Sequence, residues 1–297
     1  MKKMTKFFAL ALLAGPMVAC STEDTAPSVQ NDKVAVQFTG GISVNTRAAG
    51  LAWAEGDMIG IFMTGTKQPL SADAIQEGVD NICYQTSGSI GFSPVSGGKT
   101  VFFPIDGDVD FYSYYPQTTV NDYKVALDVT DQGKQEAIDF MYAKTEGCNK
   151  ATPQVFLKFY HKLSNLVLDV QPGNGLTQED LKKMTVTVKG QNTKATFNLA
   201  DGTISGEGNP TDIKMKTTQA GKLYEAILLP TEEASRVIEF DLNNGYDAPF
   251  VWTMPAKLEG GNRYHYTVVK LSRSAVEISG TIKPWTEAGD NNEHVAQ

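Results

Sequence analysis

The chain has 297 residues, 41% of them hydrophobic and 20% charged, which is enough for two domains of ordinary size. Its formal charge is −8, and without the three lysines among its first six residues it becomes −11. Because nucleic acids and anionic lipid surfaces attract clustered Lys and Arg, this acidic balance argues against nucleic-acid binding and against electrostatic attachment to a membrane.

The N-terminus has the organisation of an export signal. Three lysines precede an apolar run over residues 7–13, which is too short to span a bilayer. A buried N-terminal helix is disfavoured because Gly15-Pro16 would break it. Met17-Val18-Ala19-Cys20 resembles a bacterial lipobox, in which the signal is cut before a cysteine that receives acyl chains such as palmitate. We therefore expect residues 1–19 to be a lipoprotein signal peptide and Cys20 to be the membrane anchor.

Residues 20–32 are polar and lack periodicity, so they predict a flexible tether. Within them, Glu23-Asp24 resemble the acidic export tag of Bacteroidetes surface lipoproteins, or they are simply solvated linker charges. Beyond the tether, Val34, Val36 and Phe38 alternate with other residues in the pattern of a strand.

Similar strand patterns, separated by Gly-rich turns, continue along the whole chain and predict an all-β fold. A turn-rich stretch ending at Thr152-Pro153 predicts a boundary between two domains, residues 33–152 and residues 153–297. The alternating run over residues 155–170 would supply the opening strands of the second domain, which has enough strands for two packed sheets.

Helices should be few and short, at most one or two. One is predicted over Gln178–Met184, with Thr177 as N-cap and Asp180 completing a capping box; a charged loop is the alternative. Aromatic side chains, Trp53 and Tyr112 to Tyr115, are expected to fill the first core.

The sequence has no nucleophile elbow, phosphate loop or zinc-protease motif. We predict no catalytic residues, no cofactor and no metal site, and hence no enzyme. Asp106, Asp108 and Asp110 alternate, which indicates either weak cation binding or an acidic turn. Cys83 and Cys148 could form a disulfide after export, or they could be two free thiols.

Several segments together resemble the fimbrillin family, the lipoprotein pilins of Bacteroidetes type V pili. They are Trp53 to Phe62 (WAEGDMIGIF), Phe111 to Pro116 (FYSYYP), Phe159 to Leu166 (FYHKLSNL), Ile227 to Pro230 (ILLP), Gly261 to Tyr266 (GNRYHY) and Ile282 to Trp285 (IKPW). The resemblance implies two transthyretin-like Greek-key β-sandwich domains in tandem. It also implies a structural role, with adhesion, in a fimbrium at the cell surface, where an outer-membrane lipoprotein associates with other pilin subunits.

The same resemblance implies assembly by donor-strand insertion. Residues 33–47, with Val34, Val36 and Phe38, would be a removable leader strand, and an arginine-specific protease would cut between Arg47 and Ala48. Arg47 is the only arginine before Arg236 and lies among small, polar residues, a setting that favours proteolysis. It could equally be an ordinary surface arginine.

The candidate donor strand lies near the C-terminus, where Val276, Ile278 and Ile282 alternate with polar residues. An incoming strand of this kind can restore a broken backbone ladder and fill side-chain pockets. The alternative is that residues 275–283 only complete their own domain. A second function remains open, a monomeric surface lipoprotein that binds a glycan or host ligand. It should show a groove with several exposed aromatic side chains, with Trp252 and Trp285 as candidates.

Overall fold

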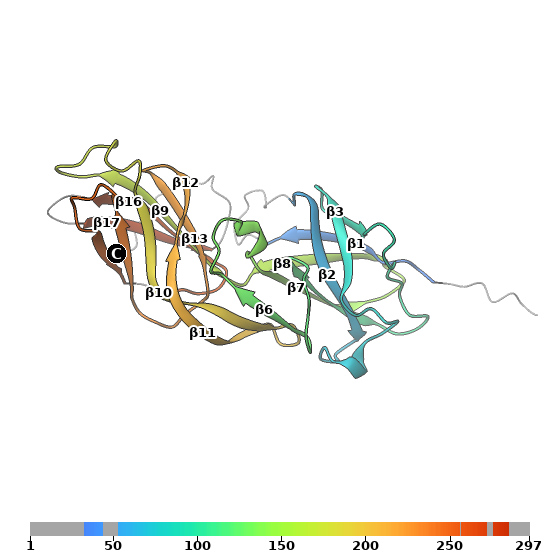
Figure 1. Ribbon diagram of the computed structural model, residues 1–297. Helices are drawn as coiled ribbons and strands as arrows, with labels where there is room; N and C mark the ends of the chain where they lie inside the picture. Colours follow the sequence, from blue (N-terminus) through green and yellow to red (C-terminus); the bar gives the residue numbers. More distant parts are fainter. Residues whose placement is uncertain (1–32, 44–52, 256, 272–275, 285–297) are drawn as a thin grey trace, which may run out of the picture. The chain divides into compact units, whose positions relative to one another are not determined.

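The computed structural model describes residues 33–43, 53–255, 257–271 and 276–284 (Figure 1). These residues are almost entirely β, and their helices are two single 3-10 turns, η1 (Ala72–Ala74) and η2 (Gln135–Ala137). The all-β prediction is confirmed, whereas the Greek-key connectivity stays a prediction. In the described part of the chain, no helix is long and apolar enough to cross a membrane.

Seven strands close into a barrel. In spatial order they are β1 (Gln37–Ile42), β4 (Gly91–Pro94), β3 (Ile82–Ser87), β2 (Glu55–Gly65), β5 (Val109–Tyr115), β7 (Met141–Cys148) and β8 (Gln154–His161). Alternate residues of these strands point inward and form a core rich in aromatic rings, among them Phe38, Tyr84, Phe111 and Phe159.

The other strands form two sheets. One contains β11 (Thr203–Lys214), β10 (Thr185–Asn198), β14 (Arg236–Asp241) and β15 (Phe250–Met254), with β6 (Lys124–Asp128) also paired to β10. The other has the order β12 (Lys216–Gln219), β13 (Leu223–Leu228), β9 (Ser164–Pro172), β16 (Asn262–Leu271) and β17 (Val276–Pro284). Buried side chains from both sheets belong to one core.

Strand β8 corrects one expectation. The sequence places the run over residues 155–170 at the opening of the second domain, but β8 pairs in parallel with β1 and antiparallel with β7 inside the barrel. The chain enters the sheet that contains β13, β9 and β16 only after His161, and β9 begins three residues later. The division at residues 152 and 153 therefore stays a prediction, and a division after His161 fits the pairing better.

Strand β5 is buried on both faces, and this corrects the expected aromatic core. Tyr115 lies with Trp53 in the barrel core, as predicted. Tyr112 and Tyr114 point to the opposite face and belong to the core that the two sheets share. Successive side chains of a strand alternate between faces, so a continuous aromatic run cannot fill only one core.

Strand β6 directly connects the two halves of the chain, the barrel through His161 and the two sheets that follow it. It follows the barrel strand β5 in sequence, yet it pairs antiparallel with β10, with Val125 opposite Phe197 and Leu127 opposite Ala195 (Figure 1). A few residues later the buried Gln132 side chain donates to the Ile227 carbonyl at 2.9 Å and accepts from the Ile227 N–H at 2.8 Å. Backbone pairing and this amide therefore join the halves.

The predicted helix over Gln178–Met184 is wrong, because this segment forms turns. Its capping box does form: the Thr177 N–H donates to the Asp180 carboxylate at 2.7 Å, and the Asp180 N–H donates to the Thr177 hydroxyl oxygen at 3.4 Å. The backbone bonds that follow span three residues instead of four, as in the bond from the Met184 N–H to the Leu181 carbonyl. A correct N-cap is therefore not enough to propagate an α-helix over so short a segment.

Candidate functional site

The predicted leader strand occupies a slot in the barrel wall. β1 lies between β4, to which it is antiparallel, and β8, to which it is parallel. Backbone bonds hold it on both sides, for example from the Gly40 N–H to the Ile90 carbonyl at 2.7 Å and from the Gln37 N–H to the Pro153 carbonyl at 2.9 Å. Without β1 both neighbouring strands would present unpaired backbone groups.

Side chains of the leader strand fill the middle of the barrel core. Val36 and Phe38 are buried, with 5% and 2% of their surfaces exposed, and the partly buried Val34 packs against the same core. The Phe38 ring meets the rings of Tyr84 and Phe111 edge to face, with centroids 5.2 and 5.1 Å apart. Of the three predicted leader residues, only Phe38 lies in β1, whereas Val34 and Val36 precede it. All three contribute to the same core, and their removal is not tested by this arrangement.

An aromatic cage surrounds the second half of β1. Trp53 meets both Phe92 and Phe159 edge to face at 5.1 Å, and its indole N–H donates to the Gly40 carbonyl at 2.8 Å. Our sequence analysis missed Gly40 and its cage. A Gly-Gly pair inside an otherwise alternating strand is the signal that could have revealed them, because it marks close approach of other atoms to the backbone.

The candidate donor strand lies at the edge of a sheet. Among the described strands β17 pairs only with β16, antiparallel, and its residues Val276, Ile278 and Ile282 stand opposite Leu271, Val269 and Tyr264. The structure therefore shows this strand completing its own sheet, the alternative that the sequence left open. An edge strand has one hydrogen-bonded neighbour, so it is held less firmly than an interior strand.

The remaining predicted positions have different outcomes. Cys20, Arg47 and Ala48 lie outside the described residues. Cys83 and Cys148 are free, partly buried thiols. Burial raises the pKa of both, that of Cys148 to about 11, and the nearby carboxylates of Asp110 and Asp108 act in the same direction for Cys148.

Asp110 has a structural role at one end of the barrel. Its buried carboxylate accepts hydrogen bonds from the Lys67 N–H at 2.8 Å, the Gly147 N–H at 2.9 Å and the Thr66 hydroxyl at 3.0 Å. These donors tie the loop after β2 and the end of β7 to β5. The described residues contain no group of three or more His, Cys, Asp or Glu that could hold a metal ion. Asp110 itself lies in β5, and only Asp106 and Asp108 belong to the loop before that strand, so both readings of the acidic motif stay predictions.

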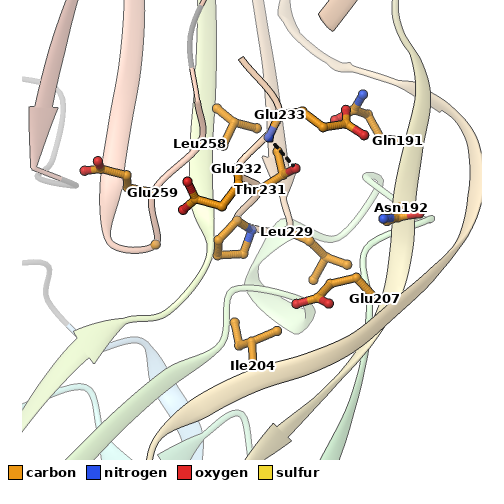
Figure 2. A pocket seen from close by; sticks show the side chains of 12 residues that line it. Gln191, Asn192, Ile204, Glu207, Leu229, Thr231, Glu232, Glu233, Leu258 and Glu259 are labelled. Atoms are coloured by element: carbon orange, nitrogen blue, oxygen red, sulfur yellow. Dashed lines mark hydrogen bonds between the residues drawn. The ribbon is translucent and has the colours of Figure 1, made fainter. Parts of the chain in front are cut away.

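A polar pocket of about 530 Å³ lies in the second half of the chain (Figure 2). Four glutamates line it, and they come from β11, from the loop after β13 and from the turn before β16; they are Glu207, Glu232, Glu233 and Glu259. Lys257 pairs with Glu232 at 2.5 Å. None of the described residues that line this pocket is aromatic, and exposed aromatic side chains are the feature expected of a glycan groove. Trp252 is half-buried against Tyr266, and Trp285 lies outside the described residues.

Comparison with known proteins decides the family. A fimbrillin-like family model matches residues 46–285, which is more than half of the chain. This chain belongs to the fimbrillin-like family. The resemblance that the sequence motifs indicated is thereby confirmed, and the family is one of fimbrial structural proteins rather than of enzymes.

Relatives of this fimbrillin-like chain agree with that assignment. It is 33% identical over 301 residues to the Bacteroides uniformis protein named "Putative fimbrium subunit Fim1C", with 95% of this chain and 96% of the relative covered. The crystal structure of a "putative cell adhesion protein" from the same species has a TM-score of 0.73 and 31% identity, covering 86% of this chain and 99% of that one. A second such structure, from Bacteroides ovatus, has a TM-score of 0.69 and 26% identity with the same coverage. The fimbrillin-like chain is accordingly a fimbrial subunit, a component of a cell-surface appendage.

Proposed function

We propose that this chain is a structural fimbrium subunit that assembles by exchanging its own first strand for a strand of a neighbouring subunit. It is exported as a lipoprotein, acylated on Cys20 and exposed at the outer membrane. An arginine-specific protease then cuts between Arg47 and Ala48, which releases the leader strand. The observation that supports this most directly is the position of β1, which is the first strand of the described residues and yet lies inside the barrel wall between β4 and β8.

Removal of the leader would expose apolar side chains of the core and leave backbone groups without hydrogen-bond partners. Val36 and Phe38 each contribute about 1.5–3 kcal/mol by burial, and their loss would expose Tyr84 and Phe111 to water. The backbone groups that β1 satisfies on β4 and β8 would also lose their partners. Another extended segment with inward apolar residues would cover the core and pair the free backbone groups, so an empty slot favours capture of a strand from a neighbour.

The C-terminal strand β17 is our candidate for that segment. It alternates apolar and polar residues, and its place at a sheet edge leaves one side of its backbone without a partner strand. Members of the family with adhesion in their names suggest that the assembled fibre contributes to cell adhesion.

The test follows the mature protein at the cell surface. N-terminal sequencing should find Ala48 as the first residue of polymerised subunits, and Arg47→Ala should leave the leader attached and abolish polymers. Thr46→Ala, which changes the neighbouring residue and keeps the arginine, is the matched control and should polymerise normally. Polymers formed by uncut Arg47→Ala would contradict the proposal, and a chain that stays monomeric after cutting would instead favour a monomeric surface binder.

A further inference from the structure

Gly40 lies where the barrel has no space for a side chain. A Cβ atom built on Gly40 would lie 2.8 Å from Cε2 of Phe92 and 3.2 Å from Cε2 of Phe159. Both rings are buried and contact Trp53 edge to face, so neither can move away freely. The cage of Trp53, Phe92 and Phe159 therefore accepts glycine at this position of the strand and excludes larger residues.

The neighbouring Gly41 is constrained less strongly, on the outer face. A Cβ atom there would lie 2.8 Å from Cζ of Phe156, but that ring is 53% exposed and can turn into solvent. The restriction on what can occupy the slot thus comes mainly from the inner face, at Gly40.

The leader and β17 share one pattern around a glycine. In the leader, Val36, Phe38, Gly40 and Ile42 occur at alternate positions, and in β17 the same spacing is given by Val276, Ile278, Gly280 and Ile282. Two of the residues between them also correspond in character, Gln37 with Glu277 and Thr39 with Ser279. Gly280 is the only glycine in β17, so the pattern fixes a single alignment of the two strands.

We propose that the aromatic cage sets the register and the direction of the inserted strand, with Gly280 of the neighbouring subunit in the place of Gly40. This inference rests on the proposed function, because it presumes that β17 enters the slot. A shift by one residue would turn the apolar residues outward. A shift by two would bring Ile278 or Ile282 into the cage, where the space for a Cβ is already missing.

The direction follows from the same alignment. In the reversed direction, with Gly280 still in the cage, Pro284 would take the position of Val36. Reversal with the same face inward also turns the backbone groups at that position from Val101 toward Pro153. The Pro153 carbonyl accepts the Gln37 N–H at 2.9 Å, and proline at position 284 has no N–H to replace it. The inserted strand should therefore run parallel to β8, as the leader does.

The experiment uses the purified mature chain, cut after Arg47 with the leader still seated in its slot. A synthetic peptide of residues 274–288 is added, and release of the leader is followed by mass spectrometry over a range of peptide concentrations. The peptide carrying Gly280→Val should displace the leader at least about tenfold less well, because overpacking a closed site is costly. The peptide carrying Ser279→Val, which adds bulk at the adjacent outward position, is the matched control and should remain within about threefold of the natural peptide.

The outcomes separate the two proposals. If the natural peptide displaces the leader and Gly280→Val does so equally well, the register inference is overturned while the proposed function stands. The register inference is also overturned if the Ser279→Val peptide displaces the leader as poorly as the Gly280→Val peptide does. If the natural peptide never displaces the leader, the proposed function fails and the inference fails with it. The Phe92→Leu substitution in the cut chain makes more room in the cage. In that chain the Gly280→Val peptide should displace the leader better than in the natural chain, whereas the Ser279→Val peptide should show no such gain.

Discussion

Replacing Phe38 by alanine tests how firmly the leader strand is held in the barrel. The ring is 98% buried and contacts Tyr84 and Phe111 edge to face at 5.2 and 5.1 Å. Truncation of a buried Phe to Ala costs about 3–5 kcal/mol through lost burial and the cavity that remains. Each aromatic pair accounts for about 0.5–1.5 kcal/mol of that cost. We therefore expect Phe38→Ala to lower the free energy of unfolding of the uncut chain by about 4 kcal/mol.

Urea denaturation of the uncut chain, followed by intrinsic fluorescence, measures this loss. With a urea dependence of about 3 kcal/mol/M, the midpoint should fall by roughly 1–2 M. Gln37→Ala is the matched control, because the exposed Gln37 precedes Phe38 on the same strand and should change stability by about 0.5 kcal/mol or less. A loss below about 1 kcal/mol for Phe38→Ala would refute the reasoning, since the leader would then contribute little to the core it enters.

Three further expectations concern buried polar groups and thiols. Asp110→Ala leaves three donors without their acceptor, so it should lower the free energy of unfolding by about 2–4 kcal/mol in the same urea assay. Asp108→Ala is the control and should lower it by less than about 1 kcal/mol. Gln132→Ala removes the buried amide between the halves and should cost about 2–3 kcal/mol by thermal unfolding; a change under 0.5 kcal/mol would contradict that role. Because burial raises the pKa of Cys148 from 9.0 to about 11, alkylation of its thiol should be slow at pH 8. The same shift stabilises the fold below pH 9, and this contribution should be lost as the pH rises through about 11; rapid alkylation of the folded chain at pH 8 would show the burial to be wrong.

Local patterns in the sequence were sufficient to predict strands but not which core each face of a strand packs into. The alternation of Val34, Val36 and Phe38 correctly indicated inward-facing side chains, because a strand with one buried face shows a period of two. In β5 both faces are buried, so the alternation disappears and the sequence cannot tell which core each tyrosine joins.

Long-range pairing was the main source of error. β8 and β9 form one nearly continuous alternating run, and only their partners show that the first closes the barrel and the second enters another sheet. The Gly-Gly pair could have indicated a close approach at Gly40, but not which side chains make it, because Trp53, Phe92 and Phe159 are distant from one another in sequence. Cys20 and Arg47 were named from the sequence and lie outside the described residues.

The pairing of β6 with β10 has a consequence for any attempt to recombine members of this family. A hybrid joined after His161 would combine a β6 from one parent with a β10 from another, and their five opposed residue pairs would have to match anew. The amide of Gln132 would likewise have to find an equivalent of Ile227 in foreign sequence. Chimeras should therefore be soluble only when β6 and the segment through Gln132 come from the same parent as the C-terminal half. The junction of a chimera should accordingly be placed before β6 and not after His161.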